Sequence, residues 1–256
     1  MTAQAEGIIG RKSETRRVVS HIRNRKSLHI YGPEGSGKTA LLDWVYDSWG
    51  TLGTPLVPIY CRSSRTFRQI LLYISTFFLG HFKHLESVDK FKRIYEINCG
   101  TDLKKLSIRA LKKMIFSYIS LDDFCILLDH LDHVTPKINA FLVPLYERAL
   151  VISASRQSWE VADYTFRGNL EYCLYLTPKL RIENLSRRDI SHLMRVIAGD
   201  RFYSVENLFG EIYRITRGNP RIAGNIISKA RLPKYHLDGS INLKLIMLDL
   251  KIENIR

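Results

Sequence analysis

The stretch Gly32-Pro33-Glu34-Gly35-Ser36-Gly37-Lys38-Thr39 decides the fold, because it matches the pattern G-x-x-x-x-G-K-[ST] at every fixed position. The run Ser27–Tyr31 before it predicts a short strand, and Thr39–Trp49 after it carries apolar residues at helical spacing. Between a strand and a helix, the glycines let the backbone curl so that several N–H groups point at one anion. The start of the helix adds partial positive charge. The sequence therefore predicts a phosphate-binding loop.

The side chains of this loop predict a nucleoside triphosphate, ATP, as the ligand, together with Mg²⁺. Lys38 would reach the β- and γ-phosphates, and the Thr39 hydroxyl would hold the metal. We expect the site to extend into the first turn of the helix. The candidate binding residues are Gly32, Pro33, Glu34, Gly35, Ser36, Gly37, Lys38, Thr39 and Ala40.

Short apolar runs recur along the chain after the loop, with helical patterns between the first three of them. Their alternation predicts an α/β fold, a three-layer P-loop NTPase with a parallel sheet of about five strands. The longest apolar stretch, Ile70–Phe82, is too short to cross a bilayer and predicts a buried helix. The additional predicted strands are Leu56–Tyr60, Phe124–Leu128, Ala149–Ser153 and Tyr172–Leu176.

Strand signals fade after Pro178, and helical patterns take over. A capping pattern at Ser186 opens a helix through about Ala198, and two more helices are predicted over Val205–Thr216 and Pro220–Lys229. Residues 241–256 fit either a terminal helix or a strand. We therefore expect two domains, a P-loop core over residues 1–180 and a helical lid with a C-terminal tail over residues 181–256.

An acidic residue, Asp129, ends the apolar run Phe124–Leu128. This is typical of the Walker B motif, whose carboxylate holds Mg²⁺ through water at the end of a buried strand. We expect Asp129 and Thr39 to serve the metal. The next residue in many ATPases of this kind is a Glu that polarises the attacking water, but here it is His130. Either a neutral His130 or Asp132 orients water, or both are ordinary loop residues.

On the basis of these motifs, the chain resembles the AAA+ ATPases and the related STAND class over about residues 7–232. It is most similar to archaeal origin-recognition and transposition-helper ATPases. Gly10–Glu14 resembles an element beside the adenine, which implies that Ile8, Ile9 and Arg11 lie near the base. Leu150–Arg156 resembles the sensor 1 strand. That likeness implies that Ser153 or Ser155 hydrogen-bonds to the γ-phosphate and that Arg156 contacts it. The candidate catalytic residues are therefore Lys38, Asp129, His130 and Arg156.

The same resemblance assigns three further arginines. Gly218–Arg221 resembles the sensor 2 element, which implies that Arg221 folds over the nucleotide from the start of a lid helix. Arg167, and less strongly Arg148, take the place of an arginine finger that reaches a neighbouring subunit. For these two, an exposed and solvated side chain is the competing interpretation.

The chain is strongly basic, with 39 Lys and Arg against 25 Asp and Glu and a net charge of +14. The charge gathers in residues 11–26, 62–68 and 104–113, which favours DNA as a partner, although solvated helix faces would look the same. The four cysteines have no metal-binding or redox spacing, and residues 1–7 do not resemble a signal peptide. We expect a cytoplasmic protein without membrane contact.

These observations predict an ATP-binding, Mg²⁺-dependent ATP hydrolase with slow or regulated turnover, an atypical Asp129-His130 pair and DNA association. A homo-oligomer or a protein partner is compatible with this function. The alternative is a STAND-like switch that binds ATP and regulates a protein partner without nucleic acid. A small-molecule kinase is less favoured, because the C-terminal helices match a lid better than an acceptor-binding domain.

Overall fold

The computed structural model describes residues 8–97, 100–120, 122–159, 172–199, 206–237 and 240–255. They form two compact units, which are described separately. The first, called here the sheet unit, is Glu14–Gly32 with Lys38–Arg181. The second, the helical unit, comprises the described parts of Met1–Ser13, Pro33–Gly37 and Ile182–Arg256. The domain division at residue 180 stays a prediction.

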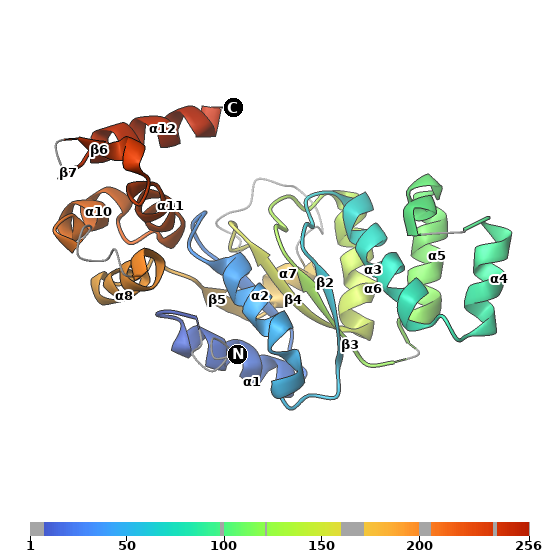
Figure 1. Cartoon of the computed structure of the whole chain (residues 1–256). Coiled ribbons are helices and arrows are strands. Elements are labelled where there is room, and N and C mark those ends of the chain that lie inside the picture. The colour runs from blue at the N-terminus through green and yellow to red at the C-terminus, as the bar shows by residue number, and fades with distance from the viewer. Residues whose placement is uncertain are drawn as a thin grey trace. The chain divides into compact units, whose positions relative to one another are not determined.

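The sheet unit is built on five parallel strands in the order β2-β3-β4-β1-β5 (Figure 1). The α/β fold predicted from the phosphate loop is thereby confirmed. Because β4 lies between β1 and β3, the residue that follows β4 lies between the ends of those two strands. The strands are β1 Leu28–Tyr31, β2 Val57–Cys61, β3 Phe124–Leu128, β4 Leu150–Ser155 and β5 Lys179–Arg181.

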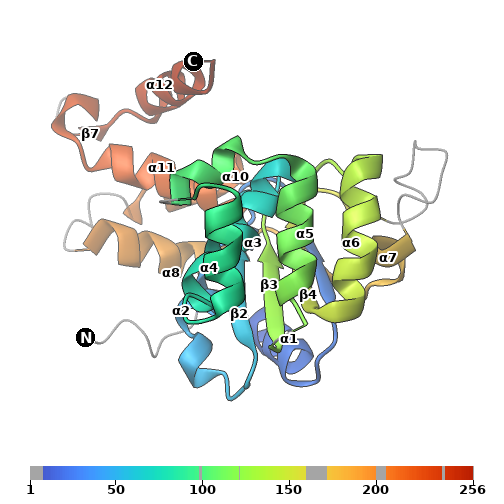
Figure 2. The ribbon, with the colours of Figure 1, turned by 90° about the vertical axis from the view of Figure 1, so that its right-hand side faces the viewer.

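Helices cover both faces of the sheet, with α3, α5 and α6 on one face and α1 and α2 on the other (Figures 1 and 2). Every residue of β3 and β4 is buried in consequence, which explains their unbroken apolar sequences. The predicted buried helix near residue 70 is α3. The helices are α1 Lys12–Arg23, α2 Lys38–Asp47, α3 Phe67–His81, α4 Glu86–Ile94, α5 Ile108–Tyr118, α6 Pro136–Arg148 and α7 Tyr172–Leu176, with short 3-10 turns at Trp49–Thr51 and Gly100–Lys105.

The prediction of a strand at Tyr172–Leu176 was wrong. This segment is helix α7, and the fifth strand is β5, which pairs with β1 through Ile30 and Leu180. A run of five apolar residues does not by itself distinguish a buried strand from a short helix, and in α7 Leu174 is buried whereas Tyr175 and Leu176 are exposed. As the edge strand, β5 buries only Leu180, so its sequence carries no apolar run.

The helical unit packs its helices around one apolar core that includes Ile190, Met194, Ile226 and Ile246. The predicted cap is present, since the Ser186 hydroxyl accepts a hydrogen bond from the Asp189 amide. Of the C-terminal stretch left open between helix and strand, residues 243–255 form helix α12. The elements are α8 Arg187–Ala198, α10 Phe209–Thr216, α11 Pro220–Ala230, a 3-10 turn at Pro233–Tyr235, an antiparallel pair β6 His236–Leu237 and β7 Ser240–Ile241, and α12 Leu243–Ile255.

Within the described part of the chain, no helix has the length and apolar character needed to span a membrane.

Candidate nucleotide-binding site

Two glycines shape the loop between β1 and α2, as the motif requires. Gly35 has φ +76°, and a Cβ added there would lie 2.7 Å from Asn219 Oδ1. Gly37 has φ +101°, yet a Cβ added there would meet nothing within 4 Å. Gly35 is therefore needed for its backbone and for close approach, and Gly37 for its backbone alone. The space beside Gly37 is open, which leaves room for a phosphate group to approach the loop backbone.

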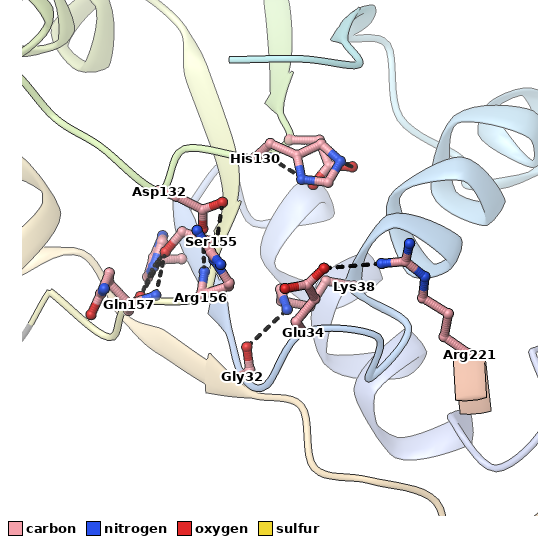
Figure 3. A network of polar contacts seen from close by, with 11 residues as sticks. Gly32, Glu34, Lys38, His130, Asp132, Ser155, Arg156, Gln157 and Arg221 are labelled. Carbon is pink, nitrogen blue, oxygen red and sulfur yellow. Dashed lines mark hydrogen bonds and ion pairs between the residues drawn. The ribbon is translucent and has the colours of Figure 1, made fainter. Parts of the chain in front are cut away.

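The loop is anchored to the start of α11 by contacts within the helical unit (Figure 3). Asn219 caps α11 through the Ile222 amide, and its Nδ2 donates to the Glu34 carbonyl at 2.8 Å. The Arg221 amide donates to the Gly35 carbonyl at 3.3 Å, and Arg221 Nη1 lies 3.0 Å from Glu34 Oε1. The structure thus brings the sensor-like Arg221 to the loop itself.

Arg11 supports the backbone of the same unit. Its side chain is buried and donates to the Ser36 carbonyl at 2.8 Å and to the Glu183 carbonyl. Ile9 is partly buried in the turn before α1, where the Ile8 carbonyl accepts from the Arg11 amide at 3.1 Å. The guanidinium therefore steadies the loop, and a direct contact of Arg11 or Ile9 with a base stays a prediction.

In the sheet unit, Lys38 is the first residue of α2. Its Nζ donates to the Gly32 carbonyl at 2.8 Å, so the ammonium group folds back towards the loop (Figure 3). Thr39 and Ala40 follow on the exposed first turn of the helix. The charge and the hydroxyl that the motif requires are therefore accessible.

Asp129 follows β3 and is almost completely buried. Its Oδ1 accepts from the His130 amide at 2.8 Å, whereas its Oδ2 is buried without a hydrogen-bond partner in the described residues. Burial raises the pKa of this carboxyl, and the Thr39 hydroxyl and His130 act in the opposite direction. An ionised oxygen that lacks a donor is costly to bury, so it suits a site where a metal-bound water donates to it.

Mg²⁺ fits these residues as a partly hydrated ion. In the described ranges, no group of three or more His, Cys, Asp or Glu side chains could hold a metal. Mg²⁺ usually keeps several waters and binds through one or two carboxylates together with substrate phosphates. Thr39 and Asp129 offer one hydroxyl and one carboxylate, which matches that coordination.

The two candidates for positioning water have different surroundings. Asp132 is engaged by Arg156, whose amide donates to Oδ1 at 2.6 Å and whose Nε lies 3.4 Å from Oδ2 (Figure 3). His130 adopts a left-handed backbone with φ +58°, and its Nε2 lies 3.6 Å from Asp129 Oδ2. Asp132 thus positions Arg156 at the end of β4, and His130 is the residue beside the proposed metal carboxylate.

His29 on β1 is a buried histidine that the sequence analysis did not identify as a site residue. Its Nδ1 lies 2.8 Å from Ser153 Oγ, and its Nε2 lies 2.9 Å from the Gln157 carbonyl and 3.2 Å from Ser155 Oγ. Both hydroxyls predicted to sense a γ-phosphate are therefore bonded to this ring. Burial lowers the pKa of His29 from 6.5 to about 4. The pairing of His29 with Ser153 in the β1–β4 register is the only signal, and the sequence does not display it.

Many of the basic side chains that were expected to bind DNA form hydrogen bonds or ion pairs with other residues of this protein. Arg62 pairs with Asp43 at 2.5 Å, and Arg68 donates to the carbonyls of Lys104 and Leu106. Lys105 belongs to the 3-10 turn before α5 and pairs with Asp102, whereas Arg109, Lys112 and Lys113 belong to α5 itself. Other internal contacts join Arg17 to the Lys179 carbonyl, Arg23 to the Leu52 carbonyl and Arg25 to Asp123.

The two candidates for an arginine finger are Arg148 and Arg167. Arg148 donates to the Pro144 carbonyl at 3.4 Å, and its guanidinium lies 5.3 Å from the centre of the Phe116 ring. Arg167 lies outside the described residues. Cys61 and Cys125 are free, buried thiols, and burial raises the pKa of both.

Comparison with known proteins rests on the fold. The chain is similar to a Walker-type ATPase of Pyrococcus abyssi, with a TM-score of 0.60, 15% identity and coverage of 97% of this chain and 76% of that one. It is also similar to domain III of the Thermotoga maritima replication initiation protein DnaA, with a TM-score of 0.57, 15% identity and coverage of 95% and 92%. It is similar as well to AMPPCP-bound DnaA from Aquifex aeolicus, with a TM-score of 0.54, 13% identity and coverage of 90% of this chain and 64% of that one.

No protein-family model and no curated protein matches the sequence. The similarity to solved structures extends over nearly the whole chain, and it agrees with a parallel sheet in which β4 is inserted between β1 and β3. The chain therefore has the fold of the AAA+ ATPases, with a P-loop core followed by C-terminal helices.

Proposed function

We propose that this chain binds ATP with Mg²⁺ and hydrolyses it slowly or under regulation. The observation that carries the proposal is Asp129, a buried carboxylate with one unpartnered oxygen, which follows the strand expected to bear the metal ligand. The open space beside Gly37 supports the same conclusion. One structure of the same fold was solved with AMPPCP, an ATP analogue, in DnaA.

The roles of the residues follow from their charges. The amides of Gly35–Thr39 and the ammonium of Lys38 would bind the β- and γ-phosphates. Arg156 and Arg221 would stabilise the negative charge that develops during phosphoryl transfer. Thr39 and Asp129 would hold Mg²⁺, which neutralises phosphate charge when bound.

Slow turnover is expected from the residue that follows Asp129. In many ATPases of the kind that this chain resembles, a Glu at that position polarises the attacking water, whereas here His130 replaces it and Asp132 is engaged by Arg156. Regulation is expected because Arg156 and Arg221 each have an acidic partner within their own unit, Asp132 and Glu34. A triphosphate would compete with those partners, and its hydrolysis would return the arginines to them.

DNA is the proposed partner. The chain would bind DNA either as a homo-oligomer or together with another protein. The net charge of +14 supports this, as does the fold shared with a replication initiation protein. A STAND-like switch acting on a protein is the second candidate. It is favoured by the two exchangeable ion pairs of Arg156 and Arg221, which allow sensing without fast turnover.

The test compares ATP affinity and turnover in the wild type, in Lys38→Ala and in Lys26→Ala. Lys26 is exposed and pairs with no described residue, so Lys26→Ala removes the same charge outside the loop. We expect Lys38→Ala to lose ATP binding by at least about a hundredfold while it keeps its fold, and Lys26→Ala to bind normally. Equal affinity in all three proteins would refute the proposal.

Turnover with and without DNA separates the two candidate functions. Hydrolysis that is stimulated by DNA supports the DNA-associated ATPase. Tight ATP binding with hydrolysis that DNA does not change supports the switch.

A further inference from the structure

A basic cavity in the helical unit is lined by residues of α8 and by Phe209, the first residue of α10. Its volume is about 640 Å³, large enough for a nucleobase with its sugar and phosphate. It lies outside the three basic clusters singled out from the sequence. The residues that matter for its chemistry are Arg187, Arg188, Asp189, His192, Arg195 and Phe209.

The charge of this cavity is unbalanced. Among the lining residues that the structure describes, three arginines face one acid, Asp189, whose Oδ2 already accepts from the Ser186 hydroxyl at 2.6 Å. Arg188 and His192 are exposed and have no hydrogen bond or ion pair with any residue that the structure describes. The exposed guanidinium of Arg188 is well suited to phosphate, because it can donate two parallel hydrogen bonds.

The cations of the cavity lie along one face of α8. Arg188, His192 and Arg195 are four and three residues apart, which places them on one face of α8. The rise of an α-helix separates the first from the last by about 10 Å along its axis. Three cations over this length can contact successive phosphates of one strand.

An aromatic platform completes the cavity. The guanidinium of Arg187 lies 5.4 Å from the centre of the Phe209 ring, within the range of a cation–π contact. Phe209 and Arg187 both present flat π-faces on which a base can stack. A duplex keeps its bases paired and stacked inside, so only an unpaired base can use this platform.

We propose that this cavity is a binding site for single-stranded nucleic acid. Arg188, His192 and Arg195 contact the phosphates, and a base lies against Phe209 and Arg187. The proposal deepens the DNA association proposed above, since it names a surface and a strand form, and it rests on that function only for its biological setting.

The experiment measures binding of a fluorescent oligothymidylate of about 20 nucleotides by anisotropy, without added nucleotide. The test variant is Arg188→Gln/Arg195→Gln, and the matched control is Arg214→Gln/Lys251→Gln. Arg214 and Lys251 belong to the same unit, are exposed and do not line the cavity. Both double variants remove two positive charges, so non-specific attraction falls equally in each.

We expect the test variant to bind at least about tenfold more weakly than the control at low salt. The slope of log affinity against log salt should fall by about 1.4 in the test variant, because two phosphate contacts are lost. Phe209→Leu should weaken the oligothymidylate while leaving duplex binding unchanged. Circular dichroism checks that each variant is folded.

Equal affinity of the two double variants would overturn the proposal, as would absence of binding by the wild type. Displacement of the oligonucleotide by polyglutamate of equal charge at equal or lower concentration would also overturn it, in favour of an acidic protein surface. Lys38→Ala separates this result from the ATPase proposal. The site is supported if Lys38→Ala binds the oligonucleotide like the wild type, and loss of binding there would assign the strand to the phosphate loop instead.

Discussion

Arg221 Nη1 lies 3.0 Å from Glu34 Oε1, so a lid-type arginine forms an ion pair with the loop proposed to hold phosphate. Asn219 and the Arg221 amide fix the loop backbone next to this pair, at Glu34 and Gly35. A phosphate bound in the loop would offer Arg221 a stronger anionic partner than Glu34 does. Both side chains are more than half exposed, at 62% and 65%, so the pair is weak enough to exchange.

Glu34→Gln is expected to tighten ATP binding by about twofold to fivefold, because it removes the competing carboxylate from an exposed pair. Arg221→Ala should weaken ATP binding by about tenfold or more, because a charge-assisted contact is lost. Isothermal titration calorimetry measures both. Glu211→Gln, an exposed acid of α10, removes the same charge elsewhere in the helical unit. If Glu34→Gln weakens binding, or matches Glu211→Gln, the competition model is wrong.

Asp129→Asn separates the catalytic and structural consequences of a buried carboxylate. We expect ATP turnover to fall by at least about a hundredfold while nucleotide affinity changes much less, since the amide no longer attracts Mg²⁺. The free energy of unfolding of the nucleotide-free protein should rise by about 1 kcal/mol, because an unsatisfied buried charge is removed. Denaturant unfolding and a phosphate-release assay measure these effects. Equal loss of binding and turnover would contradict a metal role.

His130→Glu is expected to raise the turnover number by about tenfold or more. The carboxylate would accept a proton from the attacking water, and general bases contribute about a hundredfold to ten-thousandfold. His130→Gln is the control, because it preserves size and polarity without a base and should turn over no faster than the wild type. The measurement is steady-state phosphate release at saturating ATP. A fall in turnover for His130→Glu would show that His130 itself positions the water.

The sequence predicted the parts of the site whose residues are contiguous. The loop glycines, the strand before them and the Asp at the end of β3 are local patterns, and a motif specifies their backbone geometry directly. The Ser186 cap is equally local, since it joins residues three apart. Such features depend on short-range sterics and hydrogen bonds, which a single sequence displays.

Contacts between distant residues were not predictable in the same way. The motif around Arg11 predicts a place beside the base, which stays a prediction, and it gives no sign that the guanidinium donates to the carbonyl of Ser36, 25 residues away. Likewise, the edge strand β5 is set by pairing with β1 and carries little apolar pattern of its own. The sensor-like strand predicts that Ser153 or Ser155 reads a γ-phosphate, but it gives no sign that the β1–β4 register places both hydroxyls against His29.

His29 gives the sheet unit a measurable pH dependence. Because the Gln157 carbonyl can only accept, Nε2 carries the proton and Nδ1 accepts from the Ser153 hydroxyl, which keeps the ring neutral. The folded pKa of about 4 lies below the unfolded value of 6.5, so stability is full above pH 6.5 and falls towards pH 4. The loss amounts to about 3 kcal/mol and should be absent in His29→Gln. Urea unfolding across this range measures it, with His133→Gln, an exposed histidine, as the control. The assignment is wrong if His29→Gln and His133→Gln show the same slope.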